Sequence, residues 1–328
     1  MPVDWSSLVR TIQAHKSFLL MTHIRPDADG LGSQLALAAG MRSLGKSVRV
    51  SIASPLPERY RFLDRDGSAI EQFRLPGDGF RDVDCVFVMD TGTWNQLGDF
   101  GPFLQSLNCT KAVIDHHRTQ DDLGGERYVD VSAEATGRLS WEILKALNAT
   151  ITPGMANHLF MALALDTGWF RHPNTTAASL ALAAELVGLG AEPSPLYEQL
   201  FEAAPIGRLK LSGRALERLT VHPGGRIAYT EIKLTDYADC GAVPGDTEEL
   251  INYPRAIEGV EVALVFIEQP EGGTKVSFRA RSKVDVSKVA EAFGGGGHKL
   301  ASGAKTATDL TTTKAAVLLA VEAAPGLA

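Results

Sequence analysis

Residues 17–45 read SFLLMTHIRPDADGLGSQLALAAGMRSLG and change character twice. The first seven residues form an apolar run of strand length, which breaks at IRPDADG. The chain then resumes in small and apolar residues that suit a helix packed on a sheet. This stretch therefore predicts a strand, a loop that carries acidic residues, and a helix.

The same alternation continues through the first half of the chain. Apolar runs that end in polar residues occur at SVRVSI (47–52), DCVFVMDTG (84–92) and KAVIDHH (111–117), and helical patterns cover 133–147, 153–165 and 175–189. Continuous apolar strands that alternate with helices indicate an α/β fold with a mostly parallel sheet. Such a sheet binds ligands at the carboxyl ends of its strands.

The composition changes after Gly190, where AEPSPLYEQLFEAAPIGRLK contains three prolines, as a connector would. We predict a first domain over 1–190, a linker over 191–212 and a smaller α/β domain over 213–328. The second domain is expected to contain strands at RIAYTEI, VEVALVFIEQ and TKVSFRARS and helices at VSKVAEAF and TTTKAAVLLAVEAA.

Composition and charge exclude several classes of protein. Apolar residues make up 45% and charged residues 22%, which is typical of an ordered globular chain. We find no secretory signal and no apolar run of the roughly 20 residues that span a bilayer, so we expect a soluble, cytoplasmic protein without a membrane partner. Three dispersed cysteines suggest neither a disulfide framework nor a zinc knuckle. A formal net charge of −7 argues against binding to long double-stranded nucleic acid.

Acidic and histidine residues gather where the apolar segments of the first half end. They are His23, Asp27 and Asp29 after the first strand, Asp90 after the third, Asp115, His116 and His117 after the fourth, and Asp166 after an apolar helix. Because parallel strands end at one edge, these side chains should converge. So many carboxylates would repel one another unless divalent cations neutralised them, and Asp/His mixtures suit Mn²⁺ or Mg²⁺.

Each of these fragments also has a plainer interpretation. Asp29 could be only a helix N-cap, and His116 alone could be a structural histidine. A dinucleotide-binding loop is a poor match, because Gly30 and Gly32 lack the third glycine of the GxGxxG pattern. The ordered set is what favours a metal site.

The second domain contains a separate candidate site. Between Lys275 and Lys305 seven Lys and Arg residues outnumber two Asp and Glu residues. Arg279 and Arg281 alternate on one predicted strand and so share a face. The run GGGGHK, which includes Gly295, Gly296, Gly297 and His298, could turn its backbone N–H groups towards an anion, or could be a flexible linker.

The order THIRPDADGLGS, VMDTG, IDHH and LDTGWF resembles the four signature motifs of the DHH phosphoesterases. SFRARS followed by GGGGHKLASG resembles the DHH-associated domain of the nanoRNase/pAp-phosphatase branch. SAEATGRLSWEIL is similar to a further family stretch, although it departs from the commoner Ser-Ser-Thr form.

The resemblance implies two divalent ions, with Mn²⁺ preferred and Mg²⁺ as an alternative. One ion would be held by His23, Asp27 and Asp90, and the other by Asp29, Asp90, His116 and Asp166. Asp90 would bridge the ions, Asp115 would act behind His116, and His117 would contact the phosphate or donate a proton. Arg279, Arg281, Gly295, Gly296, Gly297 and His298 would bind substrate.

The implied reaction is hydrolysis of short oligoribonucleotides to mononucleotides and of 3′-phosphoadenosine 5′-phosphate (pAp) to AMP, and the implied assembly is a homodimer. The sequence leaves open a phosphodiesterase for cyclic or linear dinucleotides. A pyrophosphatase would have a different second domain, and a RecJ-like exonuclease would need additional nucleic-acid-binding modules. A catalytically dead nucleotide sensor predicts a lost ligand, whereas all six predicted ligands are present.

Overall fold

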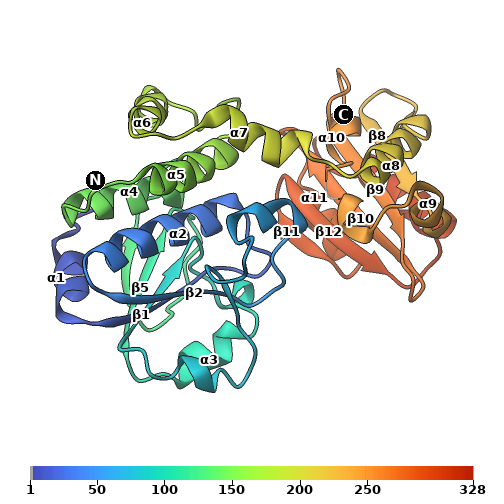
Figure 1. Cartoon of the computed structure of the whole chain (residues 1–328). Helices are drawn as coiled ribbons and strands as arrows, with labels where there is room; N and C mark the ends of the chain where they lie inside the picture. The colour runs from blue at the N-terminus through green and yellow to red at the C-terminus, as the bar shows by residue number, and fades with distance from the viewer. Residues whose placement is uncertain (1–2, 248, 328) are drawn as a thin grey trace. The chain divides into compact units, whose positions relative to one another are not determined.

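The computed structural model describes residues 3–247 and 249–327 (Figure 1). The chain divides into two compact units, Met1–Ala203 and Ala204–Ala328, which we call the N-terminal and C-terminal units. Each unit is built around its own six-stranded sheet. Within the described residues, none of the helices has the length and apolar character needed to cross a membrane.

The sheet of the N-terminal unit runs in the order β3-β2-β1-β4-β5-β6, and neighbouring strands pair in parallel. Its strands are β1 (Ser17–Met21), β2 (Ser47–Ile52), β3 (Glu71–Gln72), β4 (Cys85–Met89), β5 (Thr110–Asp115) and β6 (Glu126–Val129). The predicted parallel α/β fold is confirmed. The strand order reverses between β1 and β4, and such sheets bind ligands at the carboxyl ends of the strands beside that reversal.

The helices of this unit complete its core. They are α1 (Ser6–Ala14), α2 (Ala28–Ser43), α3 (Phe100–Ser106), α4 (Thr136–Ala146), α5 (Pro153–Asp166), α6 (Ala177–Gly188) and α7 (Pro193–Tyr197). Shorter helical segments are the 3-10 helices η1 (Glu58–Leu63), η2 (Asp78–Phe80) and η3 (Trp94–Gln96) and the π-helix η4 (Glu198–Glu202). Helix α2 is buried along most of its length against α4 and α5. A Cβ at Gly32 would lie 2.4 Å from the carbonyl oxygen of His158 in α5, so this glycine allows the close approach.

The C-terminal unit has a mixed sheet in the order β11-β12-β10-β9-β8-β7. Its strands are β7 (Thr220–Val221), β8 (Ile227–Ile232), β9 (Val262–Glu268), β10 (Thr274–Ala280), β11 (Gly296–His298) and β12 (Ala301–Thr306). Its helices are α8 (Ile206–Glu217), α9 (Leu234–Cys240), α10 (Asn252–Arg255), α11 (Val286–Glu291) and α12 (Leu310–Glu322), with the turn η5 (Pro244–Thr247). Strands β8 and β9 pair in parallel, and the other described pairs are antiparallel. The smaller second α/β domain is confirmed as a fold.

The predicted linker over 191–212 contains α7, η4 and the beginning of α8. One segment differs from the sequence-based expectation. The glycine run ends in a strand, because Gly296 pairs with Gly303 and His298 pairs with Ala301 across the β11–β12 hairpin. This segment is too short and too rich in glycine to show the alternation of apolar and polar residues that indicates a strand.

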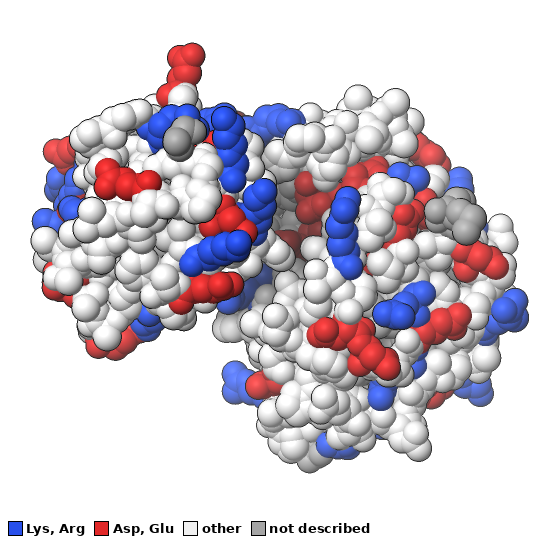
Figure 2. Space-filling view, turned by 180° about the vertical axis from the view of Figure 1, so that it is seen from behind, with Lys and Arg blue, Asp and Glu red and all other residues white. Residues whose placement is uncertain are grey.

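The surface mixes the two signs of charge. On the face drawn in Figure 2, Lys and Arg side chains are interspersed with Asp and Glu side chains over the described residues. A continuous basic band, which would neutralise successive phosphates of a long nucleic acid, is not visible on that face.

Candidate metal centre

Seven acidic and histidine side chains of the N-terminal unit converge at the edge where β1, β4 and β5 end. Their ligand atoms form three groups, each with members within 4.8 Å of one another: His23, Asp27 and Asp90; Asp29, His116 and Asp166; and Asp90, His116 and His117. The elements that deliver them are the ends of the three strands, the N-terminal end of α2 and the last residue of α5. The structure therefore brings together side chains that are far apart in the sequence.

The first group lies at the end of β1. His23 Nε2 is 3.4 Å from Asp90 Oδ2 and 3.8 Å from Asp27 Oδ1. The other ring nitrogen, Nδ1, lies 2.9 Å from the carbonyl oxygen of Ile24. A backbone carbonyl at Nδ1 selects the tautomer that leaves the Nε2 lone pair for a metal ion.

Asp27 also begins helix α2. Its Oδ1 accepts hydrogen bonds from the backbone N–H groups of Asp29 at 3.0 Å and Gly30 at 3.1 Å, so Asp27 is the N-cap. The N-cap role considered for Asp29 thus belongs to Asp27, two residues earlier. The carboxylate of Asp29 is therefore not the helix cap and lies among the other side chains of the cluster.

The second group surrounds His116. Its Nε2 lies 3.6 Å from Asp29 Oδ2, 3.6 Å from Asp90 Oδ1 and 3.9 Å from Asp166 Oδ2. Its Nδ1 lies 3.1 Å from the carbonyl oxygen of Ala133. As at His23, a main-chain carbonyl at Nδ1 leaves Nε2 available as a ligand atom.

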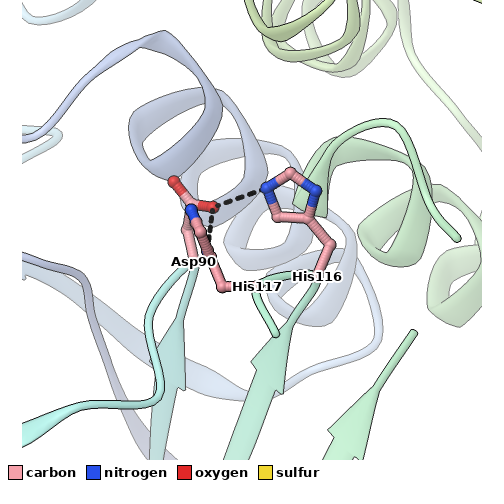
Figure 3. A group of neighbouring side chains, drawn as sticks. All are labelled: Asp90, His116 and His117. Atoms are coloured by element: carbon pink, nitrogen blue, oxygen red, sulfur yellow. Dashed lines mark ion pairs between the residues drawn. The ribbon is translucent and has the colours of Figure 1, made fainter. Parts of the chain in front are cut away.

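Asp90 lies between the two groups. Figure 3 shows the rings of His116 and His117 turned towards its carboxylate at the end of β4. Its side chain is 2% exposed, and its backbone φ of +60° is in the left-handed region, which non-glycine residues rarely adopt. Oδ2 faces His23 and Oδ1 faces His116. The carboxylate therefore has one oxygen available to each group.

Charges in the cluster are poorly balanced without cations. Burial and the negative charges of Asp90 and Asp166 raise the pKa of the Asp29 carboxyl well above its usual range. Burial also raises the pKa of Asp166 to about 6. Burial alone would lower the pKa of His23, but the carboxylates of Asp27 and Asp90 outweigh it and raise that pKa to about 11. The donor set therefore fits divalent cations, whose charge would favour carboxylates and neutral imidazoles.

Asp115 contacts a different histidine from the one predicted. Its Oδ1 accepts a hydrogen bond from His117 Nδ1 at 2.8 Å, whereas it contacts His116 only through that residue's backbone N–H. This bond, opposed in part by burial, raises the pKa of His117 to about 9. The expectation that Asp115 acts behind His116 is therefore corrected. The sequence DHH could not distinguish the two rings, because their orientations depend on side-chain rotamers.

Further contributors at the start of α4 were missed. The backbone N–H groups of Thr136 and Gly137 donate to Asp29 at 2.7 and 2.8 Å, and the Thr136 hydroxyl donates to Asp90 Oδ1 at 3.0 Å. Ser33 Oγ also donates to Asp29, at 3.1 Å. The resemblance of the segment SAEATG to a family stretch does not by itself predict a role for Thr136. Its one local signal was a Thr-Gly pair at the start of a helical pattern.

The predicted substrate residues of the C-terminal unit lie on its β10–β12 side. Arg279 is half-buried and donates one hydrogen bond, to the carbonyl oxygen of Phe278 at 3.0 Å. Arg281 instead donates to the carbonyl oxygens of Val260 at 3.1 Å and Arg255 at 2.9 Å, so much of its guanidinium holds the preceding loop in place. Burial and the positive charge of Arg255 lower the pKa of Arg279, a setting that an anion would relieve.

The glycine run has a structural reason for its composition. A Cβ at Gly295 would lie 2.1 Å from the carbonyl oxygen of Gly303, and Gly297 has φ +141° with a Cβ position 2.6 Å from the carbonyl oxygen of Ala301. His298 is exposed at the end of β11. Close packing onto β12 thus accounts for two of the glycines and leaves His298 accessible.

Comparison with known families agrees with this fold. Residues 17–165 match the model described as "DHH family, N-terminal domain", and residues 224–323 match the DHHA1 domain. The chain belongs to the DHH family of phosphoesterases.

Similar proteins align with most of the chain. The bifunctional oligoribonuclease and PAP phosphatase NrnA of Thermus thermophilus is 31% identical over 87% of this chain and 82% of its own length. The protein of the same name in Bacillus subtilis is 27% identical over 91% of this chain and 92% of its own length. A solved exopolyphosphatase-related protein from Bacteroides fragilis superposes with a TM-score of 0.89 at 20% identity, over 96% of this chain and 94% of that one, which supports the fold.

Proposed function

We propose that this protein hydrolyses short oligoribonucleotides to mononucleotides and pAp to AMP, using two divalent ions with Mn²⁺ preferred. The observation that carries the proposal is the cluster around Asp90, which groups His23 and Asp27 on one side and Asp29, His116 and Asp166 on the other. The substrate class is supported by the two relatives named as oligoribonuclease and PAP phosphatase.

The proposed ligands are His23, Asp27 and Asp90 for one ion and Asp29, Asp90, His116 and Asp166 for the other. Mixed carboxylate and imidazole donors without thiolates suit Mn²⁺ or Mg²⁺. When bound, such ions neutralise the carboxylates, activate water and stabilise charge on the phosphate. The protein's part is to hold these side chains in place, and the carbonyls at His23 Nδ1 and His116 Nδ1 do so by fixing both rings.

We assign His117 the role of proton donor to the leaving oxygen. The Asp115 carboxylate accepts a hydrogen bond at Nδ1 and raises the pKa of the His117 ring, which favours its protonated form. No side chain within the described ranges is in hydrogen-bonding contact with Nε2, and 48% of the His117 side chain is exposed. Nε2 is therefore the atom that can reach a substrate.

For the C-terminal unit we propose binding of the substrate's second phosphate by Arg279 and His298. Arg279 makes one described hydrogen bond through a guanidinium that offers five N–H donors, whereas Arg281 spends several of its own on backbone carbonyls. Arg279 is thus the stronger candidate of the two. Gly296 and Gly297 would contribute backbone N–H groups on the edge strand beside His298. The N–H of Gly295 instead donates to the carbonyl oxygen of Ala290 at 2.9 Å, so this glycine would act by allowing the close packing.

The deciding experiment is a substrate panel with Mn²⁺, in which products from pAp, pApA, cyclic di-AMP, pyrophosphate and long single-stranded DNA are separated by chromatography. We expect the highest kcat/KM on pAp and pApA. A dominant rate on pyrophosphate would sink the nucleotide assignment, and a dominant rate on cyclic di-AMP would move it to cyclic dinucleotides. Light scattering of the same preparation tests the proposed homodimer.

A further inference from the structure

Thr136 connects two of the proposed metal ligands. Its side chain is fully buried at the first residue of α4. The hydroxyl donates to Asp90 Oδ1 at 3.0 Å, and the backbone N–H of the same residue donates to Asp29 Oδ2 at 2.7 Å. Asp90 directly follows β4 and Asp29 lies in the first turn of α2, so a single residue joins carboxylates from two separate elements.

The hydrogen bond from the Thr136 hydroxyl restrains rotation of the Asp90 carboxylate about its Cβ–Cγ bond. The terminal torsion of an aspartate is broad, so rotation about its Cβ–Cγ bond costs little on its own. In Asp90 this rotation matters, because Oδ2 lies 3.4 Å from His23 Nε2 and Oδ1 lies 3.6 Å from His116 Nε2. A donor held on Oδ1 keeps each oxygen on its own side.

Thr136 can serve as such an anchor because its own position is tightly defined. Ala135, the residue before it, is extended at φ −163°, and the adjacent Gly137 N–H donates to Asp29 Oδ1 at 2.8 Å. A Cβ at Gly137 would lie 2.5 Å from the Cβ of Ala162 in α5, so the start of α4 sits directly against α5. A shift of Thr136 would therefore disturb packed neighbours.

We propose that Thr136 is a positioning residue: its hydroxyl holds the Asp90 carboxylate in the orientation that serves both metal groups, while its main chain holds Asp29. This inference rests on the proposed two-ion site and adds a residue to it. It assigns Thr136 no contact with substrate.

The test compares Thr136→Val, which keeps the shape and the backbone N–H but loses the hydroxyl, with Thr136→Ser, which keeps the donor. Ser140→Ala is the matched control, because Ser140 is a fully buried hydroxyl on the same helix with no hydrogen-bond partner in the described structure. Each protein is titrated with Mn²⁺ alone by calorimetry, melted in chelator, and assayed for kcat and KM on pApA.

We expect Thr136→Val to bind Mn²⁺ about ten- to hundredfold more weakly, as loss of an outer contact to a metal ligand typically does. At saturating Mn²⁺ its kcat should fall while KM changes little. Thr136→Ser should recover most of both losses, and Ser140→Ala should match the wild type.

Two results would overturn the inference. One is wild-type Mn²⁺ affinity and kcat in Thr136→Val. The other is a lower melting temperature with unchanged Mn²⁺ affinity and kcat, which would make Thr136 only a helix-start residue. If the wild type hydrolyses no nucleotide, the proposed function fails, but the Mn²⁺ titrations still decide the role of Thr136.

Discussion

The two candidate sites differ in how firmly their residues are held. In the N-terminal unit, Asp29 and Asp90 are each about 2% exposed and are bonded by groups from other elements. In the C-terminal unit, Arg279 is half-buried and His298 is exposed at the end of a short edge strand. A site whose buried side chains hold one another in place depends on every member, whereas side chains of a partly exposed site each contribute separately. The first site should therefore fail completely when one central group is lost, and the second should weaken by degrees.

Metal removal should produce the largest effect. Dialysis against EDTA is expected to abolish hydrolysis of pAp, and Mn²⁺ should restore it better than Ca²⁺, because Ca²⁺ favours six to eight oxygen ligands over imidazole. Elemental analysis must confirm that the dialysed protein is free of metal, with protein dialysed without chelator as the control. Full activity in metal-free protein would show that the buried cluster is not the catalytic centre.

Asp90→Asn should come next, with a loss in kcat of at least ~10³-fold, equivalent to ~4 kcal/mol, on every substrate. The amide removes the anion that faces both groups while keeping the side chain's shape. Circular dichroism should report an intact fold. Asp99→Asn is the matched control, since Asp99 is exposed and its side chain makes no capping bond. Two-ion binding with wild-type kcat in Asp90→Asn would contradict the proposed ligand set.

The C-terminal site should show a graded effect. Arg279→Ala and His298→Ala are each expected to lower kcat/KM on pAp and pApA about ten- to hundredfold, because a charge-assisted phosphate contact is worth roughly 1.5–3 kcal/mol. Both variants should spare bis-p-nitrophenyl phosphate, which has no second phosphate. Lys275→Ala provides the control, as an exposed cation on the same strand. Equal losses on both esters would leave the glycine run as a structural hairpin.

A ladder of RNA lengths extends the same comparison. If Arg279 and His298 hold a terminal group, the wild type should favour substrates of two to five nucleotides over long chains. Their Ala variants should lose part of that preference. Indifference to length in the wild type would place specificity elsewhere.

The sequence predicts the site best where the polar side chains stand at the ends of regular strands. Apolar runs that end in Asp or His indicate both the parallel strands and the edge where they meet, so the sequence alone predicts that Asp90 and His116 lie in one cluster. Periodicity does not describe contacts between elements. The bonds from Thr136 to Asp29 and Asp90 depend on how α4 meets α2 and β4, and the pairing of Asp115 with His117 depends on rotamers.

In the C-terminal unit, the sequence does not predict two of the strands. Its longer strands were predicted from alternating or continuous apolar residues, but β11 and β12 contain GGH and ASGAKT, which carry little of either pattern. Their pairing follows from the close backbone approach that glycine permits, as at Gly295 and Gly297. Such a segment resembles a linker or an anion-binding turn until its partner strand is known.

The smallest expected effect tests whether the buried His158 makes the stability of the N-terminal unit sensitive to acid. Burial lowers the pKa of His158 in α5 to about 4, below its ordinary 6.5, and its Nδ1 has no described partner. Between these values the unfolded chain binds a proton that the folded chain does not. The stability contributed by neutral His158 is therefore complete above about pH 6.5 and is lost as pH falls towards 4.

At about pH 5.5 the loss should be roughly 1 kcal/mol, and His158→Gln, which cannot titrate, should not show it. The four tryptophans, Trp5, Trp94, Trp141 and Trp169, all belong to the N-terminal unit, so their fluorescence in urea with chelator present follows that unit alone. His298→Gln is the control, because an exposed histidine of the C-terminal unit should leave this transition unchanged. Equal pH dependence in wild type and His158→Gln would contradict this prediction and would mean that α5 tolerates a charged histidine.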